Sequence, residues 1–410
     1  MNILQLSTSD IDGGAARAAY RLHTGLTLSG TSSQMLVRAK DTSDSTVAKE
    51  TSARTKLAPV LDSLPLRRYP SSSKKPFSVQ WFPDTVGNRA VDFEPDVINL
   101  HWICNGFLRI ETLRRFTQPV VWTLHDMWPF SGGCHYAGEC DRYKSQCGQC
   151  PQLSSTRQGD LSASILHRKQ TAWKDTDLTI VTPSKWLGKC AKESSLFQDR
   201  RIEVIPNGVD TDAFKPIDRE LARQILNLPP TQKIVLFCAG SSTGDPRKGF
   251  SLLTDALETL ETQKQERVSL AVLGANSPSA ESQSWKFETH YIGKLRDEIS
   301  LALVYCAADI FVAPSRQDNL PNTILEALAC GIPCVSFNIG GIPDMIDHCK
   351  NGYLAEPFKT SELAKGIKWI LEDESRYQEL SAAARSTVVE NFSIEIQAER
   401  YNMLYESLLK

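Results

Sequence analysis

Short apolar runs alternate with amphipathic stretches along most of this chain. The apolar runs predict buried strands at 2–7, 34–37, 97–102, 120–124, 178–182 and 202–205, and again at 234–238, 269–273, 288–292, 310–313 and 334–337. Segments with a 3.6-residue period predict helices from about Ala15 to Gly30 and at 109–116, 250–260, 297–306 and 323–330, with a helical tail from Ser375. Strands that alternate with helices imply parallel sheets covered on both faces.

A turn divides this pattern into two halves. Pro206-Asn207-Gly208-Val209-Asp210 is rich in turn-forming residues, and 410 residues suit two α/β domains. We predict an N-terminal Rossmann-like domain at 1–206, with a cysteine-rich insert at 132–151 and an irregular insertion at 41–90. A second such domain follows at 207–385, and helices at 386–410 pack back on the first. Two such domains imply a ligand cleft at the carboxyl ends of their strands.

Composition and charge reduce the number of function classes that fit this chain. The chain is 41 % apolar and 23 % charged, with a net charge of −2, so no overall field favours nucleic acid, and an anion must be held by local groups. The first residues are interpreted as a buried strand and not as a signal peptide, and no run approaches about twenty apolar residues. We therefore expect a cytoplasmic protein. Segment 57–75 mixes apolar residues with Arg67, Arg68, Lys74 and Lys75, which indicates either an exposed loop or docking on the inner membrane face.

Most candidate ligand-binding residues of the second half follow two of its predicted strands. The stretch 313–333 reads strand, polar loop, helix, and the helix opens near Asn322, where free backbone N–H groups favour a diphosphate. Glu326, one turn in, suits ribose hydroxyls, and Asp318 lies toward a sugar beyond the phosphates. Taken singly, Glu326 is more often a solvated helix residue and Asp318 more often a turn former. Arg247 and Lys248 follow a glycine-rich loop and suit a diphosphate leaving group, unless the loop is only a flexible surface segment.

The first half offers three candidate elements. Gly13 and Gly14 follow the first strand and allow close backbone approach of a phosphate or an acceptor, although the segment is not a full dinucleotide fingerprint. His125 ends a buried strand, in the predicted cleft. His101 is a weaker candidate on the acceptor side. A structural role is the alternative for each of them.

The stretch from Asp318 to Glu326 resembles the acid-x7-acid motif of retaining GT-B glycosyltransferases of family four, within the bacterial exopolysaccharide and cell-surface group. Lys248-Gly249 resembles the Arg…Lys-Gly segment of this family, and 340–343 and 351–354 match its C-terminal pattern. The chain departs from the family in having Asp318 for the usual Glu, Asn319-Leu320-Pro321 for Gly-Phe-Gly, and Ser241 for the earlier Arg.

The resemblance implies a GT-B fold and transfer of a sugar from a nucleotide-diphosphate donor, UDP or GDP, to a saccharide or lipid-linked acceptor with retention, in polysaccharide biosynthesis. It implies no catalytic metal, so the three D-x-D strings are not interpreted as a metal site. The catalytic residues would be His125, Lys248, Arg247 and Asp318. The donor-binding residues would be Glu326, Asn322, Thr323, Leu320, Ser242, Gly293 and Leu295, and the acceptor-side residues Gly13, Gly14 and His101.

Cys134, Cys140, Cys147 and Cys150 fall within seventeen residues, one pair as C-x-x-C. This spacing suits a structural zinc ion, with a redox pair or buried free thiols as the alternatives. Three other functions remain beside transfer: a sugar-nucleotide epimerase or hydrolase of the same fold, a catalytically silent subunit, and a zinc-clustered nucleic-acid-binding protein, against which the near-neutral charge argues.

Overall fold

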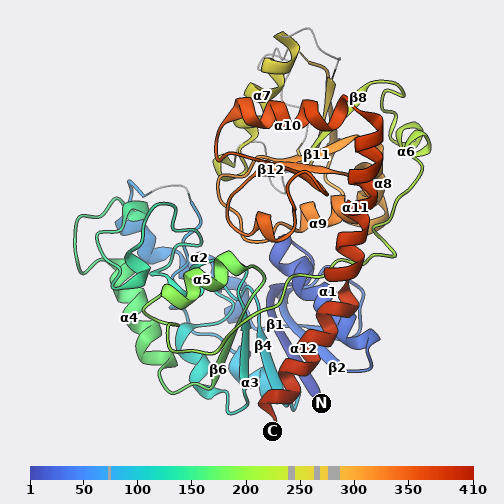
Figure 1. Cartoon of the computed structure of the whole chain (residues 1–410). Helices are drawn as coiled ribbons and strands as arrows, with labels where there is room; N and C mark the ends of the chain where they lie inside the picture. The colour runs from blue at the N-terminus through green and yellow to red at the C-terminus, as the bar shows by residue number, and fades with distance from the viewer. Residues whose placement is uncertain (73–74, 239–244, 263–267, 276–286) are drawn as a thin grey trace. The chain divides into compact units, whose positions relative to one another are not determined.

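The computed structural model describes residues 1–410 except 73–74, 239–244, 263–267 and 276–286. It divides into two compact units (Figure 1). Unit 1 comprises Met1–Pro206 and Gln397–Lys410, and unit 2 comprises Asn207–Ile396. The chain returns to unit 1 within helix α12 (Ile394–Leu408), whereas the boundary predicted at 386 falls inside α11 (Glu374–Asn391). Ser242, which the sequence analysis predicts to bind the donor, lies outside the described residues.

Unit 1 is built on a parallel sheet of seven strands in the order β3-β2-β1-β4-β5-β6-β7. Its central strands carry almost only buried residues, as a sheet covered on both faces requires. The strands are β1 (Asn2–Ser9), β2 (Ser32–Ala39), β3 (Val47–Lys49), β4 (Val97–Leu100), β5 (Val120–Thr123), β6 (Leu178–Thr182) and β7 (Ile202–Val204).

Two cores cover the faces of this sheet. One contains apolar side chains from α3 (Val86–Val91), the 3-10 helix η2 (Ile110–Arg115), α4 (Leu161–Trp173) and α5 (Lys185–Glu193). The other joins α1 (Gly14–Leu28) to α12 through Leu22, Leu26, Tyr401 and Tyr405. The C-terminal segment is therefore part of the core of unit 1. The insertion at 41–90 contains two short helices, α2 (Ala53–Asp62) and η1 (Leu64–Arg68).

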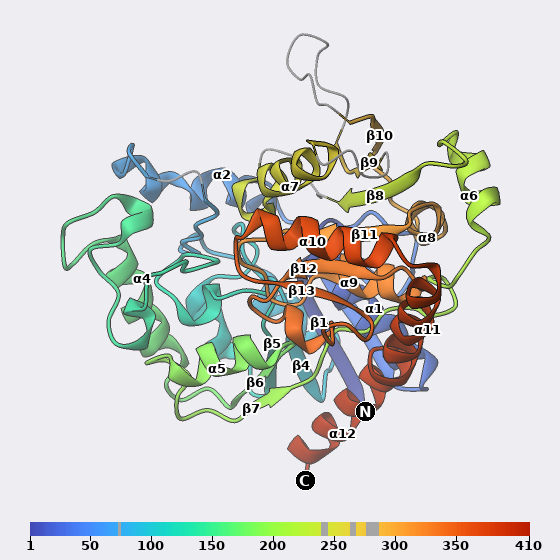
Figure 2. The ribbon, with the colours of Figure 1, turned by 45° about the horizontal axis from the view of Figure 1, so that its top comes forward.

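Unit 2 contains a parallel sheet of six strands in the order β10-β9-β8-β11-β12-β13. Figure 2 shows α7 and α10 along one face of it, and α8, α9 and α11 lie on the other, in agreement with the two apolar cores. The strands are β8 (Lys233–Cys238), β9 (Val268–Leu273), β10 (Thr289–Gly293), β11 (Ile310–Ala313), β12 (Cys334–Phe337) and β13 (Gly352–Ala355). The helices are α6 (Arg219–Leu226), α7 (Phe250–Thr262), α8 (Glu298–Ala307), α9 (Asn322–Ala329) and α10 (Thr360–Leu371).

Two local predictions differ from the structure. Segment 109–116 forms the 3-10 helix η2 and not an α-helix. The C-terminal tail is not helical throughout, because α11 ends at Asn391 and α12 begins at Ile394. The break occurs where the backbone pairs with another segment: Val209 N donates to Phe392 O at 2.9 Å, and Ile394 N donates to Val209 O at 3.2 Å. These bonds use groups that a continuous helix would bond internally.

Both sheets reverse their strand order once. In unit 1 the reversal lies between β1 and β4, and in unit 2 between β8 and β11. Connections leave such neighbouring strands in opposite directions, which opens a crevice at their carboxyl ends where ligands bind in this class of sheet. The donor-side and acceptor-side residues predicted from the sequence lie at or after the carboxyl ends of β1, β4, β5, β8, β10 and β11.

Candidate functional site

Two loops at the reversal point of unit 2 meet through charged side chains. Lys248 Nζ donates to Asp318 Oδ2 at 2.7 Å, and Arg247 Nη1 lies 3.4 Å from the same oxygen. Arg247 Nη1 also donates to the carbonyl of Gln317 at 3.2 Å, and Ser315 Oγ donates to Asp318 Oδ2 at 3.2 Å. The structure therefore brings together three of the residues that the sequence assigned separately, two from the loop after β8 and one from the loop after β11.

The local sequence explains why these loops approach so closely. Asp245 caps the 3-10 helix η6 (Pro246–Lys248) by accepting from Arg247 N at 2.9 Å, and Pro246 starts it. Gly249 then has a φ of +71°, and a Cβ there would lie 1.9 Å from the Pro314 carbonyl oxygen. Only glycine allows both this left-handed backbone and this contact.

The charge of Asp318 is stabilised in place. Its carboxylate is buried, and burial, the largest single influence, would raise its pKa. The nearby Lys248 and Arg247, with hydrogen bonds from Lys248 and Ser315, outweigh burial and hold the pKa of Asp318 below its ordinary value. Asp318 is thus an anion that orients two cations at the end of β11.

Helix α9 begins beside this cluster, in line with the predicted opening near Asn322. Leu320 and Asn322 are buried and Thr323 is half-buried. Asn207 Nδ2 donates to Asn322 Oδ1 at 3.0 Å, which fixes the first residue of the helix. The N–H groups of a first helical turn have no partners within the helix and carry its positive dipole end, so this turn suits an anion.

Glu326 is more enclosed than the sequence suggested. It is 4 % exposed, and its Oε2 accepts from the hydroxyl of Tyr305 at 2.8 Å. Tyr305 lies on α8, is fully buried, and was not singled out in the sequence. The only sequence signal for Tyr305 is a polar-tipped aromatic on an otherwise apolar helix face. Gly293 ends β10 with a φ of +76°, and Leu295 packs against the core near α8 and α9.

The glycines and histidines of unit 1 lie at its own reversal point. Gly13, with a φ of +97°, and Gly14 are both exposed, and no atom lies within 4 Å of a Cβ built at either. His125 follows β5 and is half-buried, whereas His101 follows β4 and is 3 % exposed. His101 Nδ1 lies 3.1 Å from His125 Nε2, and His101 Nε2 lies 2.8 Å from Gln5 Oε1. Gln5, in β1, was missed because it alternates with apolar residues inside a strand.

A buried carboxylate holds the segment that carries His125. Asp126 Oδ2 accepts from His135 Nδ1 at 2.6 Å and from Trp102 Nε1 at 3.0 Å, and its Oδ1 accepts from Trp128 N at 2.8 Å. His135 Nε2 in turn lies 2.9 Å from Ser78 Oγ. Burial would raise the pKa of Asp126, but His135 and these hydrogen bonds lower it overall, so Asp126 remains charged.

Lys169 fixes the same segment from α4. Its ammonium donates to the carbonyls of Trp128 and Ser131 and lies 3.7 Å above the Trp128 ring. The side chain is fully buried, and burial lowers its pKa to about 7. A lysine in an amphipathic helix gave no sequence signal of this contact.

The four cysteines of the insert line one small cavity, together with Phe77, Tyr143 and other side chains. Among the described residues, however, no three or more His, Cys, Asp or Glu side chains are arranged as a group that could hold a metal ion. The zinc site predicted from their spacing is therefore not shown. Within the same residues, no helix is both long and apolar enough to cross a bilayer.

Two family models match this chain, one in each half. The family model described as "Glycosyl transferases group 1" matches residues 218–387, and "Glycosyltransferase Family 4" matches residues 12–213. A sulfoquinovosyl transferase of Arabidopsis thaliana is 26 % identical over 77 % of this chain and 57 % of its own length. A lipopolysaccharide core biosynthesis mannosyltransferase of Rhizobium meliloti is 26 % identical over 60 % of this chain and 72 % of its own.

Solved structures show the same fold. A sucrose-phosphate synthase from Thermosynechococcus elongatus superposes with a TM-score of 0.71 at 20 % identity, covering 100 % of this chain and 99 % of its own. Anabaena HepE in complex with UDP and glucose gives a TM-score of 0.67 at 18 % identity, covering 99 % of this chain and 100 % of its own. By sequence, this chain spans 31 to 57 % of the length of the first three curated relatives that it matches.

Proposed function

Because this chain belongs to the group 1, family-four glycosyltransferases of the GT-B fold, we propose that it transfers a sugar from a nucleotide-diphosphate donor to a saccharide or lipid-linked acceptor. Retention of configuration is the outcome consistent with this family, and polysaccharide or glycolipid biosynthesis is the setting indicated by its relatives. The observation that carries the proposal is the cluster of Lys248, Arg247 and Asp318 at the reversal point of unit 2, beside the start of α9.

The proposed donor contacts are of two kinds: cationic and N–H groups bind the diphosphate, and carboxylates bind hydroxyl groups. Lys248, Arg247 and the N–H groups at Asn322 and Thr323 would neutralise the departing diphosphate, which is an electrostatic contribution to the transition state. Glu326, one of whose oxygens Tyr305 holds, would bind ribose hydroxyls. Asp318 would hold sugar hydroxyls and keep the two cations in place. This stabilisation is supplied by the protein's own groups, so the proposal includes no catalytic metal.

UDP is the nucleotide best supported by the neighbours, because HepE was solved with UDP and with UDP-glucose. GDP is the second choice. Gly293 and Leu295 would contact the nucleotide base, and Leu320 would contact the donor. Ser242, the remaining donor-binding residue expected from the sequence, lies outside the described residues. In unit 1, His125 would contact the transferred sugar, and Gly13 and Gly14 would allow the acceptor to approach the backbone.

The central test is a screen of nucleotide sugars by thermal shift, followed by transfer assays with the donor that stabilises the protein. Lys248→Ala and Glu326→Ala should each lower kcat/KM by roughly 100-fold or more, since each removes a charged partner of the bound donor. Lys350→Ala is the matched control, because that lysine is exposed and pairs only with Asp347 in the part of the chain described here. Full activity in Lys248→Ala or Glu326→Ala would exclude that residue from the site.

An epimerase or hydrolase acting on the same sugar nucleotide is the second candidate, since the unit 2 cluster would bind such a donor equally well. Incubation of the donor without acceptor separates the two functions. A transferase should consume donor slowly under these conditions and accelerate when acceptor is added. Rapid turnover of donor alone, unaffected by saccharides, would favour the alternative.

We also propose that the surface around α2 contacts anionic lipid, where a lipid-linked acceptor would lie. Leu57 and Val60 are 58 % and 61 % exposed on one face of α2, and Trp81 is 38 % exposed. Arg67 and Arg68 follow in η1 and are also exposed. Exposed apolar side chains flanked by cations are typical of interfacial segments.

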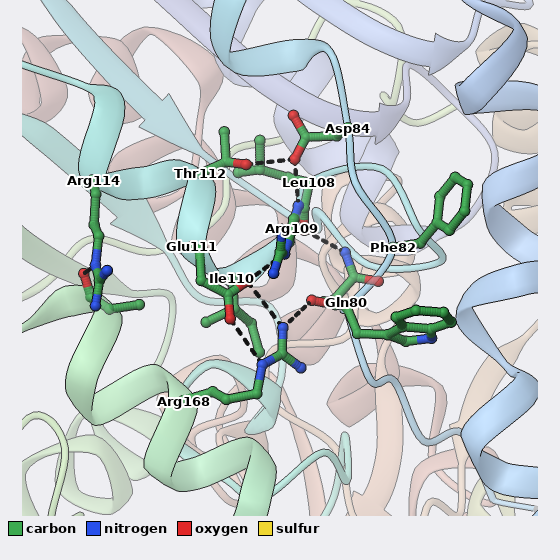
Figure 3. Close-up of polar contacts among 12 residues, drawn as sticks. Gln80, Phe82, Asp84, Leu108, Arg109, Ile110, Glu111, Thr112, Arg114 and Arg168 are labelled. Atoms are coloured by element: carbon green, nitrogen blue, oxygen red, sulfur yellow. Dashed lines mark hydrogen bonds and ion pairs between the residues drawn. The ribbon is translucent and has the colours of Figure 1, made fainter.

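Hydrogen bonds connect this surface to the rest of unit 1. The Asp62 carboxylate accepts from the backbone N of Gln80 and Trp81. Gln80 Nε2 donates to the carbonyl of Leu108 (Figure 3) and to that of Ile103. Leu57→Ser with Val60→Ser should abolish salt-sensitive co-sedimentation with phosphatidylglycerol vesicles. Ile299→Ser, which alters an exposed apolar residue of unit 2, should not change it. Absence of binding in the unmodified protein would remove the proposal.

Finally, we propose that Cys134, Cys140, Cys147 and Cys150 bind a structural zinc ion, which would require their sulfurs to converge. All four line one cavity. Burial is the largest influence on Cys147 and raises its pKa to about 11, so a zinc ion would have to displace the thiol protons to obtain its thiolate ligands. Metal analysis should find about one zinc per chain, lost in Cys147→Ser and kept in Cys349→Ser. Metal-free protein with the same stability would refute this.

A further inference from the structure

Three side chains from neighbouring strands of unit 1 form a line of hydrogen bonds. Gln5 lies in β1, His101 directly follows β4, and His125 follows β5 by two residues, and these strands are adjacent in the sheet. Gln5 Oε1 lies 2.8 Å from His101 Nε2, and His101 Nδ1 lies 3.1 Å from His125 Nε2. The two imidazole rings stack, with centroids 5.3 Å apart and planes at 27°. Gln5 and His101 are buried, so this line ends in the interior.

We propose that Gln5 and His101 are positioning residues that hold the His125 ring in one orientation and one tautomer, with its Nε2 proton directed at His101. This inference depends on the proposed function in one respect, which is that His125 lies beside the transferred sugar. Neither Gln5 nor His101 would itself contact substrate.

The donor and the acceptor in each of these hydrogen bonds follow from the number of protons that each side chain carries. A glutamine Oε1 can only accept, so Nε2 of His101 must carry the proton between them. A neutral imidazole has a single N–H, so Nδ1 of His101 must accept, and the proton between the rings must belong to Nε2 of His125. Asn99 Nδ2 also lies 3.4 Å from His101 Nε2, but the contact of that nitrogen with Gln5 Oε1 is much shorter, at 2.8 Å, and Gln5 Oε1 is therefore the partner of the His101 proton.

Burial keeps both rings neutral. It holds the pKa of His101 well below the usual range, and His125 lowers that pKa further. Burial also lowers the pKa of His125 to about 4, although the Asp126 carboxylate beside it opposes this. Asp126 is the charged group that faces His125, and its oxygens accept from His135, Trp102 and Trp128. Near neutral pH neither ring is therefore charged, and the single-proton accounting holds.

The substitution Gln5→Glu tests this assignment of donors and acceptors. A carboxylate facing His101 Nε2 would raise the pKa of His101, and a charged His101 would donate from both nitrogens. Nε2 of His125 would then have to accept, and its proton would move to Nδ1. We expect kcat to acquire an acidic limb near neutral pH that the unmodified enzyme lacks. His101→Gln should lower kcat by roughly 10- to 100-fold with little change in the donor KM, because His125 loses its fixed geometry.

The decisive measurement is histidine ¹⁵N NMR of the unliganded protein, which reports tautomers without any substrate. His125 should be protonated at Nε2 between pH 6 and 8, shift to Nδ1 in Gln5→Glu, and become a mixture in His101→Gln. His23→Gln is the matched control, because His23 is equally buried in unit 1 with both ring nitrogens bonded, to Ser33 and Thr46 at 2.8 Å each.

An Nδ1-protonated His125 in the unmodified protein, or His125 signals that ignore both substitutions, would overturn the proposal. Equal losses of kcat in His101→Gln and His23→Gln would do the same, since they would show a purely structural role. Failure to find any sugar transfer would overturn the proposed function and leave the tautomer result standing.

Discussion

Tyr305, on α8, donates a hydrogen bond from its hydroxyl to the Glu326 carboxylate. Hydrogen bonds to charged groups contribute about 1.5–3 kcal/mol. Tyr305→Phe should therefore raise the donor KM by about tenfold, because Glu326 loses its fixed orientation, with a smaller effect on kcat. Donor titrations of the transfer rate measure both constants.

Tyr401→Phe is the control for this substitution. It also removes a buried hydroxyl, one that bonds Thr123 at 2.8 Å in unit 1. It should cost about 1 kcal/mol of stability and leave the donor KM unchanged. Equal changes of KM in the two variants would show that Tyr305 acts only through general stability.

Asp318 makes stability depend on pH in a defined direction. Its pKa in the folded protein lies below the unfolded value, so the folded state binds the proton less readily. Asp318 thus contributes stability that is fully present above its unfolded pKa and is lost as pH falls through its folded pKa. The stability difference between the unmodified protein and Asp318→Asn should shrink as unfolding is measured from pH 6 down to pH 3. A constant difference would contradict the ion pair with Lys248.

Single residues also show which positions a sequence pattern can single out. Asp318, Glu326 and Lys248 could be singled out, because each belongs to a motif that follows a predicted strand. Gln5, Tyr305 and Lys169 could not, because each is a polar group inside an apolar element and its partner is distant in sequence. Only the folded sheet brings Gln5 to His101, 96 positions apart.

At the scale of elements, the conformation of the segment that carries η6, between β8 and α7, depends on one glycine. Gly249 has a φ of +71° and lies against the Pro314 carbonyl, whereas Gly30 has a φ of +83° and open space around it. Gly30→Ala should therefore cost about 1 kcal/mol, from backbone strain alone. Gly249→Ala should cost more, because the loop must also move away from β11.

Movement of that loop would separate Lys248 from Asp318, so Gly249→Ala should also weaken donor binding, and Gly30→Ala should not. Denaturant unfolding and donor thermal shifts measure the two effects. Similar results for both variants would show that the contact with Pro314 does not position the cations.

Several strands were predictable because their apolar residues and the turn residues that flank them indicate the same element. β6, β11 and β12 have the predicted bounds, since each is a short apolar run between turn residues. The break between α11 and α12 was not predictable, because it results from pairing with Val209, far away in the chain. Likewise, the pattern at 109–116 indicates a helix but does not distinguish an α-helix from the 3-10 helix η2.

At the scale of the whole molecule, the last residues belong to the first unit. Tyr401, Leu404 and Tyr405 of α12 lie in one core with Ile3 and Leu22. The hydroxyls of Tyr401 and Tyr405 also bond Thr123 and Asn99, and Asn402 bonds Thr31 at 2.9 Å. An amphipathic tail predicts a helix, but only these contacts identify the surface that it covers.

A chain ending at Ile396 should therefore lose the stability of unit 1 while the sequence of unit 2 is almost intact. Removing one large buried side chain costs about 2–5 kcal/mol, and this truncation removes at least three, which is comparable to the whole stability of a domain. Limited proteolysis should then cleave within 1–206 and spare 207–396. A chain shortened only to Leu408 should behave as the full chain does, because Leu409 and Lys410 are exposed. Protection of 1–206 in the longer truncation would show that α12 is dispensable for that core.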